Sequence, residues 1–153
     1  MHERDITAPA PPGSEAFPRA SRIGARRDFR EAYENGAKQH GRLVVVFARP
    51  RPEGGLRLGI TATRKSGGAV LRNRARRRVR EIFRRWRAAA PDKADTALDL
   101  VVNISARATR APYVALRAEV AGLLGRATTA GSKAALSNAA LPKAAASRTA
   151  ETK

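Results

Sequence analysis

The sequence predicts an α/β (α+β) two-layer sandwich with one small sheet and the element order α-β-β-α-β-α. Three short segments rich in β-branched residues, at 42–50, 56–64 and 98–105, have the composition of strands. Two longer segments, at 69–89 and 111–126, carry apolar residues at helical spacing. These segments alternate within a stretch of about a hundred residues, which is enough for one modest core.

The predicted domain begins with a short helix and a strand. Residues 26–36 read as a helix, because Asp28 suits its first turn and Gly36 its C-terminal stop. Residues 42–50 follow as a strand that ends at Pro50, because proline cannot donate to the ladder of hydrogen bonds. We therefore expect a helix followed by a strand at the start of the domain.

The remaining strands and the last helix have equally clear boundaries. A Pro-Gly-rich turn at 51–55 separates the first strand from the second, at 56–64, and a third strand is expected at 98–105. The segment 111–126 predicts an amphipathic helix with Pro112 near its start. Its apolar side is formed by Leu116, Val120, Leu123 and Leu124.

The segment between the second and third strands predicts a long basic helix from about Ala69 to Ala89, closed by Pro91. Residues 72–87 contain nine arginines and a single acid, Glu81. A helical wheel places most of the arginines opposite an apolar stripe that should pack on the sheet. That stripe consists of Leu71, Ala75, Val79, Ile82 and Trp86. Like charges four residues apart destabilise a helix, so this ridge indicates a partner that neutralises it.

The composition of the chain also indicates a polyanionic partner. The 153 residues carry a formal net charge of +18, with 31 lysines and arginines against 13 acids. Nucleic acid is the leading candidate for the partner, and an anionic membrane surface is the second. The chain has no cysteine, which excludes disulfides and thiolate metal sites. No apolar run approaches the roughly 18 residues of a membrane span, and no signal-peptide pattern is present, so a cytoplasmic protein is expected.

Both ends of the chain differ in composition from the middle. Residues 1–20 are rich in proline and poor in large apolar side chains, which predicts disorder. Residues 127–153 are rich in Ala, Ser and Thr and lack an apolar stripe, which predicts a disordered basic tail. The ordered domain is therefore expected at 21–126.

Four segments together resemble the protein subunit of bacterial ribonuclease P. The stretch KSGGAVLRNRARRRVREIF resembles the signature of that family, in which an Arg-Asn-Arg core opens a long basic helix. RRDFREAYENG resembles the first helix of the family, RLGITATRK the strand before the signature, and LDLVVNISARA the third strand with its basic exit. The resemblance implies a small sheet with a left-handed β-α-β crossover, against the usual right-handed preference.

The resemblance implies a function in tRNA processing. In that family the protein is a subunit of a ribonucleoprotein endonuclease, a hydrolase that removes the 5′ leader of precursor tRNA and leaves a 5′-phosphomonoester. The RNA subunit performs the chemistry with Mg²⁺ that it mainly binds itself. We therefore expect no catalytic residue and no metal site in this chain. Its partners would be the ribonuclease P RNA and precursor tRNA, with no membrane and no obligate protein partner.

Two binding surfaces are implied by matching the residues of this chain to the family pattern. One should face the catalytic RNA and consists of Lys65, Arg72, Asn73, Arg74 and Arg77. The other should bind the single-stranded leader and consists of Phe29, Tyr33, Val45, Phe47, Arg76 and Arg80. Aromatic platforms beside arginines suit sequence-tolerant binding of single strands. The alternative for the aromatic residues is ordinary core packing.

Three other functions remain open at this point. A ribosomal or translation-factor-like RNA-binding protein would share the basic charge but would lack a leader cleft. A membrane-surface helix would need the apolar face of the arginine helix, which the strands require as core. A DNA-binding protein is the third, because the charge pattern alone does not distinguish DNA from RNA.

Overall fold

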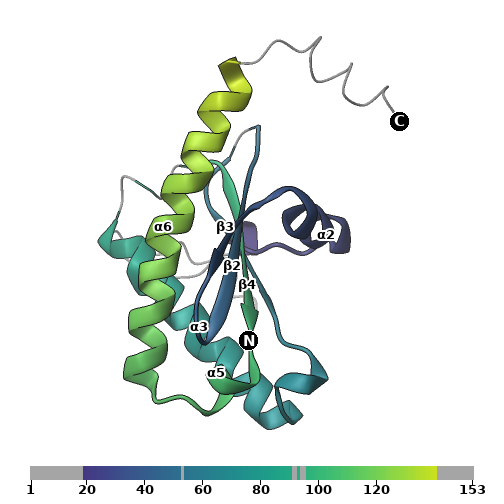
Figure 1. Ribbon diagram of the computed structural model, residues 1–153, viewed down its shortest axis with the longest axis vertical. Coiled ribbons are helices and arrows are strands. Elements are labelled where there is room, and N and C mark those ends of the chain that lie inside the picture. Colours follow the sequence, from purple (N-terminus) through teal and green to yellow (C-terminus); the bar gives the residue numbers. More distant parts are fainter. Residues whose placement is uncertain (1–18, 53, 91–92, 94–95, 141–153) are drawn as a thin grey trace, which may run out of the picture.

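The computed structural model describes residues 19–52, 54–90, 93 and 96–140 (Figure 1). Within these residues, four strands form one sheet in the order β1-β2-β4-β3. The strands are β1 (Ala37–His40), β2 (Val44–Pro50), β3 (Arg57–Thr61) and β4 (Leu98–Ile104). β2 pairs antiparallel with β1 and β4, whereas β3 and β4 are parallel. The three predicted strands are confirmed, and β1 is an addition at one edge of the sheet.

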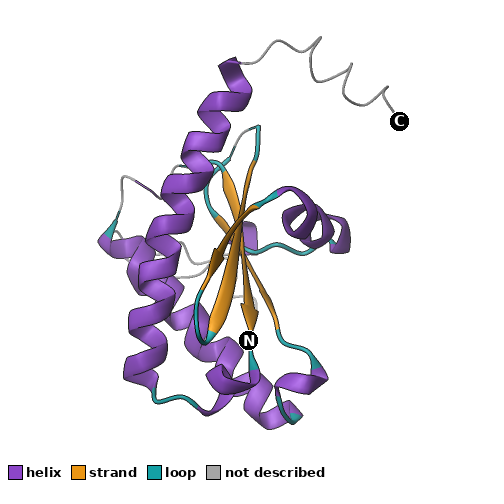
Figure 2. Ribbon diagram, viewed as in Figure 1, coloured by secondary structure: helices purple, strands orange, loops and turns teal. Residues whose placement is uncertain are grey.

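Helices lie on both faces of this sheet (Figure 2). The helical elements are η1 (Arg19–Ser21), α2 (Arg26–Asn35), η2 (Arg64–Ser66), α3 (Ala69–Ala89), α5 (Ala106–Arg110) and α6 (Tyr113–Ala140). α3 and α6 pack together over one face and form the main helical layer, while α2 covers part of the other face. The bounds of α3 are those predicted from the sequence.

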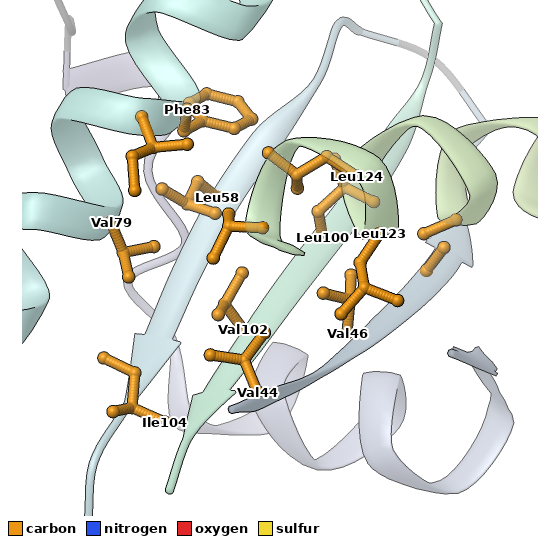
Figure 3. Packing of buried hydrophobic residues seen from close by; sticks show 14 of the residues in the cluster. Val44, Val46, Leu58, Val79, Phe83, Leu100, Val102, Ile104, Leu123 and Leu124 are labelled. Carbon is orange, nitrogen blue, oxygen red and sulfur yellow. The ribbon is translucent and has the colours of Figure 1, made fainter. Parts of the chain in front are cut away.

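The main core lies between the sheet and the α3/α6 layer (Figure 3). α6 buries the four residues predicted for it, Leu116, Val120, Leu123 and Leu124. α3 buries Ala75, Val79, Ile82 and also Phe83, which the predicted stripe did not include. Leu71 and Trp86, the two ends of that stripe, are only half-buried. The buried face of α3 is therefore turned slightly from the predicted stripe, toward Phe83.

The β3-α3-β4 connection is a left-handed crossover, as expected. Figure 3 views the sheet from the side of the α3/α6 layer, with β3 in pale blue and β4 in pale green. Both strands point downward in this view, and β4 lies to the right of β3. If this view is rotated in the plane of the page until both strands point upward, β4 lies to the left of β3 and α3 lies in front of the sheet. A right-handed connection would place β4 to the right of β3, so this crossover has the rare left hand.

The C-terminal boundary of the predicted domain is wrong. α6 continues to Ala140, so residues 127–140 are helical rather than a disordered tail. Ala127 and Thr128 are buried, and the Thr128 hydroxyl donates to the Leu124 carbonyl (2.7 Å). Gly131 lies so close to Leu98 that an added Cβ would be 2.7 Å from a leucine methyl. Small residues pack here without an apolar stripe, which is why the sequence pattern did not reveal the contact. The rest of the predicted tail, 141–153, lies outside the described residues.

The N-terminal boundary is close to the predicted one. The segment after η1 runs beside β3, where the Ile23 amide donates to the Leu58 carbonyl (2.9 Å) and Arg22 pairs with Leu58 in a parallel bridge. Ile23 is buried beneath α2. Residues 1–18 of the predicted N-terminal tail lie outside the described residues.

Candidate RNA interface

The arginines of α3 form a charged surface that acids of the chain do not neutralise. The single acid of the helix, Glu81, accepts hydrogen bonds from Arg84 and Arg85 in its second half. These bonds lower the pKa of Glu81, with the Arg85 contact as the largest cause. In the described part of the chain, no carboxylate forms an ion pair with the arginines of the first half, which are Arg72, Arg74, Arg76, Arg77, Arg78 and Arg80. The first half of α3 therefore carries positive charge that no carboxylate of the described residues offsets through an ion pair.

Four of the five residues predicted to face the catalytic RNA are exposed around the start of α3. Lys65 lies on η2, and Asn73, Arg74 and Arg77 lie on the first turns of α3. Asn73 accepts a hydrogen bond from Arg76 (3.2 Å). These residues lie on consecutive elements, because η2 leads directly into α3.

The fifth, Arg72, is half-buried and has a structural contact. Its Nη1 donates to the Gly67 carbonyl (2.8 Å) and so holds the turn that begins the helix. Gly67 has φ +139°, which side-chain-bearing residues rarely adopt. The hydroxyl of Ser66 donates to the Ile104 carbonyl (2.8 Å), and Thr109 donates to the Ser66 carbonyl (2.9 Å). The loop before α3 is thus attached to β4 and α5, and Lys65 is presented on a fixed support.

The predicted leader surface lies on the face of the sheet that carries α2. Phe29 lies directly over Gly59 of β3, where an added Cβ would be 2.5 Å from the phenyl ring. Tyr33 is 38% exposed, and its hydroxyl donates to the Thr61 hydroxyl (2.7 Å). The two aromatic residues of α2 therefore follow β3 along its length, as their i,i+4 spacing requires.

Phe47 does not form part of the exposed surface. It is only 7% exposed and belongs to the small core beneath α2. Tyr33 packs on it edge to face, with ring centroids 4.9 Å apart, and Lys38 Nζ lies 5.6 Å from its ring centroid. Phe47 therefore supports Tyr33 from below, which is the core-packing alternative, and its predicted contact with a leader stays a prediction. The alternation of side chains along a strand correctly predicts that Phe47 and Val45 share one face of the sheet. It does not predict that α2 covers Phe47 on that face.

The predicted leader residues are distributed over two hollows. Phe29, Arg76 and Arg80 line a cavity of about 190 Å³ at the edge of β3. Val45 is half-buried and lines a second cavity of about 320 Å³ near Lys65, at the end of the sheet where β3 and β4 finish. Tyr33 lies over Thr61, at the C-terminal end of β3. This position is between Gly59, which lines the first cavity, and the second cavity at the end of the sheet. These residues therefore lie along β3, from its middle to its C-terminal end.

A charge network that sequence reasoning missed fixes α2 on the sheet. Asp99 of β4 is 0% exposed and accepts a fork of two bonds from Arg57, at 2.7 and 2.8 Å. Arg57 also donates to Asp28 of α2 (3.2 Å), and Arg49 pairs with Glu31 of α2 (2.7 Å). The hydrogen bond with Asp99 raises the pKa of Arg57, so the guanidinium stays charged. The charged residues are visible in the sequence, but only the strand register places Arg49, Asp99 and Arg57 side by side on one face.

The described residues form neither a cluster of metal ligands nor a helix that could span a membrane. In this part of the chain, no three His, Cys, Asp or Glu side chains gather in a way that could hold a metal ion. Asp28, Glu31 and Asp99 pair with arginines. Among the described helices, none combines the length and apolar character needed to cross a membrane.

Comparison with known proteins agrees with this geometry. The family model described as Ribonuclease P matches residues 17–128. The ribonuclease P protein component of Desulfovibrio desulfuricans is 38% identical over 112 residues, which covers 72% of this chain and 85% of that protein. The corresponding component of Thermotoga maritima is 34% identical over 113 residues, which covers 74% of this chain and 97% of that protein.

Solved structures give the same result. The RNase P protein from Thermotoga maritima superposes with a TM-score of 0.60 at 33% identity, covering 69% of this chain and 96% of that one. The RNase P protein of Staphylococcus aureus superposes with a TM-score of 0.61 at 28% identity, covering 71% of this chain and 96% of that one. The residues matched by the family model include all those predicted for the two surfaces. The chain therefore belongs to the ribonuclease P protein family.

Proposed function

We propose that this chain is the protein component of a cytoplasmic ribonuclease P, which removes the 5′ leader of precursor tRNA. The observation that carries the proposal is the first half of α3, whose arginines have no carboxylate partner among the described residues. Such a ridge is stabilised when phosphates replace the missing acids. Family membership supports RNA rather than DNA or a lipid surface as the source of those phosphates.

One surface of the chain binds the RNA subunit in this proposal. Lys65, Asn73, Arg74 and Arg77 are exposed together, and arginine suits two-pronged contacts with phosphate. Arg72 contributes differently, because its bond to Gly67 holds the turn in place. The attachment of this turn to β4 and α5 means that little ordering is needed when RNA binds.

The second surface binds the single-stranded leader. Phe29 and Tyr33 offer aromatic rings along β3, and Arg76 and Arg80 border the first hollow. Stacking of a base on an aromatic side chain contributes about 1–3 kcal/mol and tolerates any base. A site of this kind suits leaders of different sequence, which a general tRNA-processing enzyme must accept.

Catalysis is assigned to the RNA subunit and its Mg²⁺. The described residues offer no fitting set of metal ligands, since the carboxylates near the leader surface are paired with arginines. The contribution of this chain is to hold the substrate strand and to neutralise phosphate charge near the RNA. No bond-breaking step is assigned to its side chains.

The leader surface is tested by replacing Phe29 and Tyr33 with alanine in the assembled ribonucleoprotein. Affinity for leader-bearing precursor tRNA should fall by at least tenfold, as expected for losing one or two stacked bases, while affinity for mature tRNA stays the same. Tyr33→Phe is the matched control, because it keeps the ring and loses only the bond to Thr61. Equal weakening of both RNAs would show that the two aromatic residues only support the fold.

A further inference from the structure

The hollow at the edge of β3 carries three arginines from two separate parts of the chain. Arg76 and Arg80 come from α3, and Arg22 comes from the segment that precedes α2. The remaining side chains around it are apolar, with Phe29 on the α2 side. Among the described residues, no carboxylate lines this cavity of about 190 Å³, and the charged side chains that line it are the three arginines.

Arg22 is held in this position by both of its neighbours. Ser21 is buried and accepts a hydrogen bond from Arg87 Nη1 of α3 (2.7 Å). Ile23 is buried beneath α2, and its amide donates to the Leu58 carbonyl. Ile23 faces α2, and side chains alternate between two sides in an extended segment. Arg22 therefore points to the other side, where it lines the hollow with Arg76 and Arg80 of α3. The guanidinium is therefore attached to a fixed piece of backbone.

The positive charges in this hollow act on one another. The pKa of Arg80 is lowered, first by its burial and then by the charges of Arg22, Arg76 and Arg77. Like charges that approach one another at a partly buried site are relieved when an anion binds among them. The hollow is thus electrostatically suited to an anion, and the space suits a group of phosphate size more readily than a folded RNA element.

The floor of the hollow adds a backbone donor. Leu58 directs its main-chain groups toward the open edge of β3, since its carbonyl accepts from Ile23. Because main-chain groups alternate along a strand, those of Ile60 face the same edge. Two residues further, Arg76 Nη2 donates to the Ala62 carbonyl (3.3 Å). The Ile60 amide therefore lies on the strand edge between two cationic side chains, where an anionic oxygen could accept from it.

We infer that this hollow binds one phosphodiester group of the RNA leader, with Arg22 as a ligand beside Arg76 and Arg80 and with the Ile60 amide as a further donor. The inference rests on the proposed function and assigns a role to Arg22, which lies outside the basic signature of α3. It also fixes the position of the leader along β3. One phosphate lies at the edge of the strand, and the adjacent base can stack on Phe29.

Arg22→Gln tests this inference in the full ribonucleoprotein with precursor tRNA. Affinity for leader-bearing substrate should fall about tenfold, the typical loss for one charge-assisted contact. The slope of log affinity against log salt should become shallower by about 0.7, as expected for one phosphate contact to a single strand. Arg117→Gln is the matched control, because Arg117 is an exposed arginine of α6 that does not line this hollow.

The phosphate is located by replacing the leader phosphodiesters one at a time with neutral methylphosphonates. One position should weaken binding to the wild-type protein about tenfold but should have little further effect on the Arg22→Gln variant. If every position weakens both proteins equally, or if Arg22→Gln binds as tightly as wild type, the inference is wrong. If wild type itself does not prefer leader-bearing tRNA to mature tRNA, the proposed function fails instead.

Discussion

Replacing Asp99 with asparagine should destabilise the protein by about 3–5 kcal/mol, the usual loss when one partner of a buried ion pair is removed. Asp99 is fully buried and holds Arg57 through two short hydrogen bonds. Nitrogen atoms of Arg49 and Arg51 lie 3.7 and 3.5 Å from its two oxygens. Asparagine keeps the size of the side chain but leaves three largely buried guanidinium groups without their common counter-charge.

This loss is large compared with the total stability of a small domain, which is about 5–15 kcal/mol. Urea unfolding, followed by circular dichroism, measures it directly. Asp28→Asn is the control, because Asp28 is partly exposed and accepts a single bond from Arg57 at 3.2 Å. Asp28→Asn should lower the free energy of unfolding by about 1 kcal/mol. A value within 1 kcal/mol of wild type for Asp99→Asn would refute the view that this carboxylate organises the network beneath α2.

The other predictions concern one glycine under the cleft, two in α6, and the acid of α3. Gly59→Ala would place a Cβ 2.5 Å from the Phe29 ring, so it should reduce affinity for leader-bearing tRNA but not for mature tRNA. Gly131→Ala should lower the free energy of unfolding by about 1–3 kcal/mol, because the added Cβ overpacks against Leu98. Gly122→Ala should raise it by about 0.5–1 kcal/mol, because the added Cβ meets nothing within 4 Å. Equal effects of the two variants would mean that α6 does not pack beyond residue 127. Because its arginine partners lower the pKa of Glu81, its contribution to stability is present at neutral pH and disappears as the pH falls through that lowered pKa. The stability difference between wild type and Glu81→Gln, measured by urea unfolding, should therefore shrink below about pH 4.

The helices of the main layer could be predicted closely from the sequence because their apolar residues recur at helical spacing. α3 begins at Ala69 and ends at Ala89 as predicted, and the apolar side of α6 is buried as expected. The extension of α6 could not be predicted in this way. Its packing near Gly131 depends on the absence of side chains, which leaves no periodic apolar signal.

β1 was missed for a related reason. Its residues, Ala37–His40, lack the β-branched and aromatic side chains typical of strands. The segment becomes a strand because antiparallel pairing with β2 satisfies its main-chain groups. Tertiary structure rather than local preference determines this element.

For the candidate site, the sequence indicated the kinds of residue involved better than their arrangement in space. The basic signature residues around Arg74 are exposed together, as the sequence and the family resemblance implied. Phe47 lies beneath Tyr33 because α2 covers that part of the sheet, a packing detail that period two does not contain. Arg22 was missed because no motif surrounds it, and only the fold brings it to Arg76 and Arg80.

The central claim is that this chain assists RNA catalysis through binding and does not cleave RNA itself. Cleavage of precursor tRNA should be measured with the purified chain alone, with the cognate RNA subunit alone, and with both, each in the presence of Mg²⁺ and at near-physiological salt. We predict no cleavage by the chain alone and a marked gain when it is added to the RNA subunit. A variant with glutamine at Arg74 and Arg77 should give a smaller gain. Cleavage by the chain without RNA, or no gain on its addition to the RNA subunit, would contradict the account.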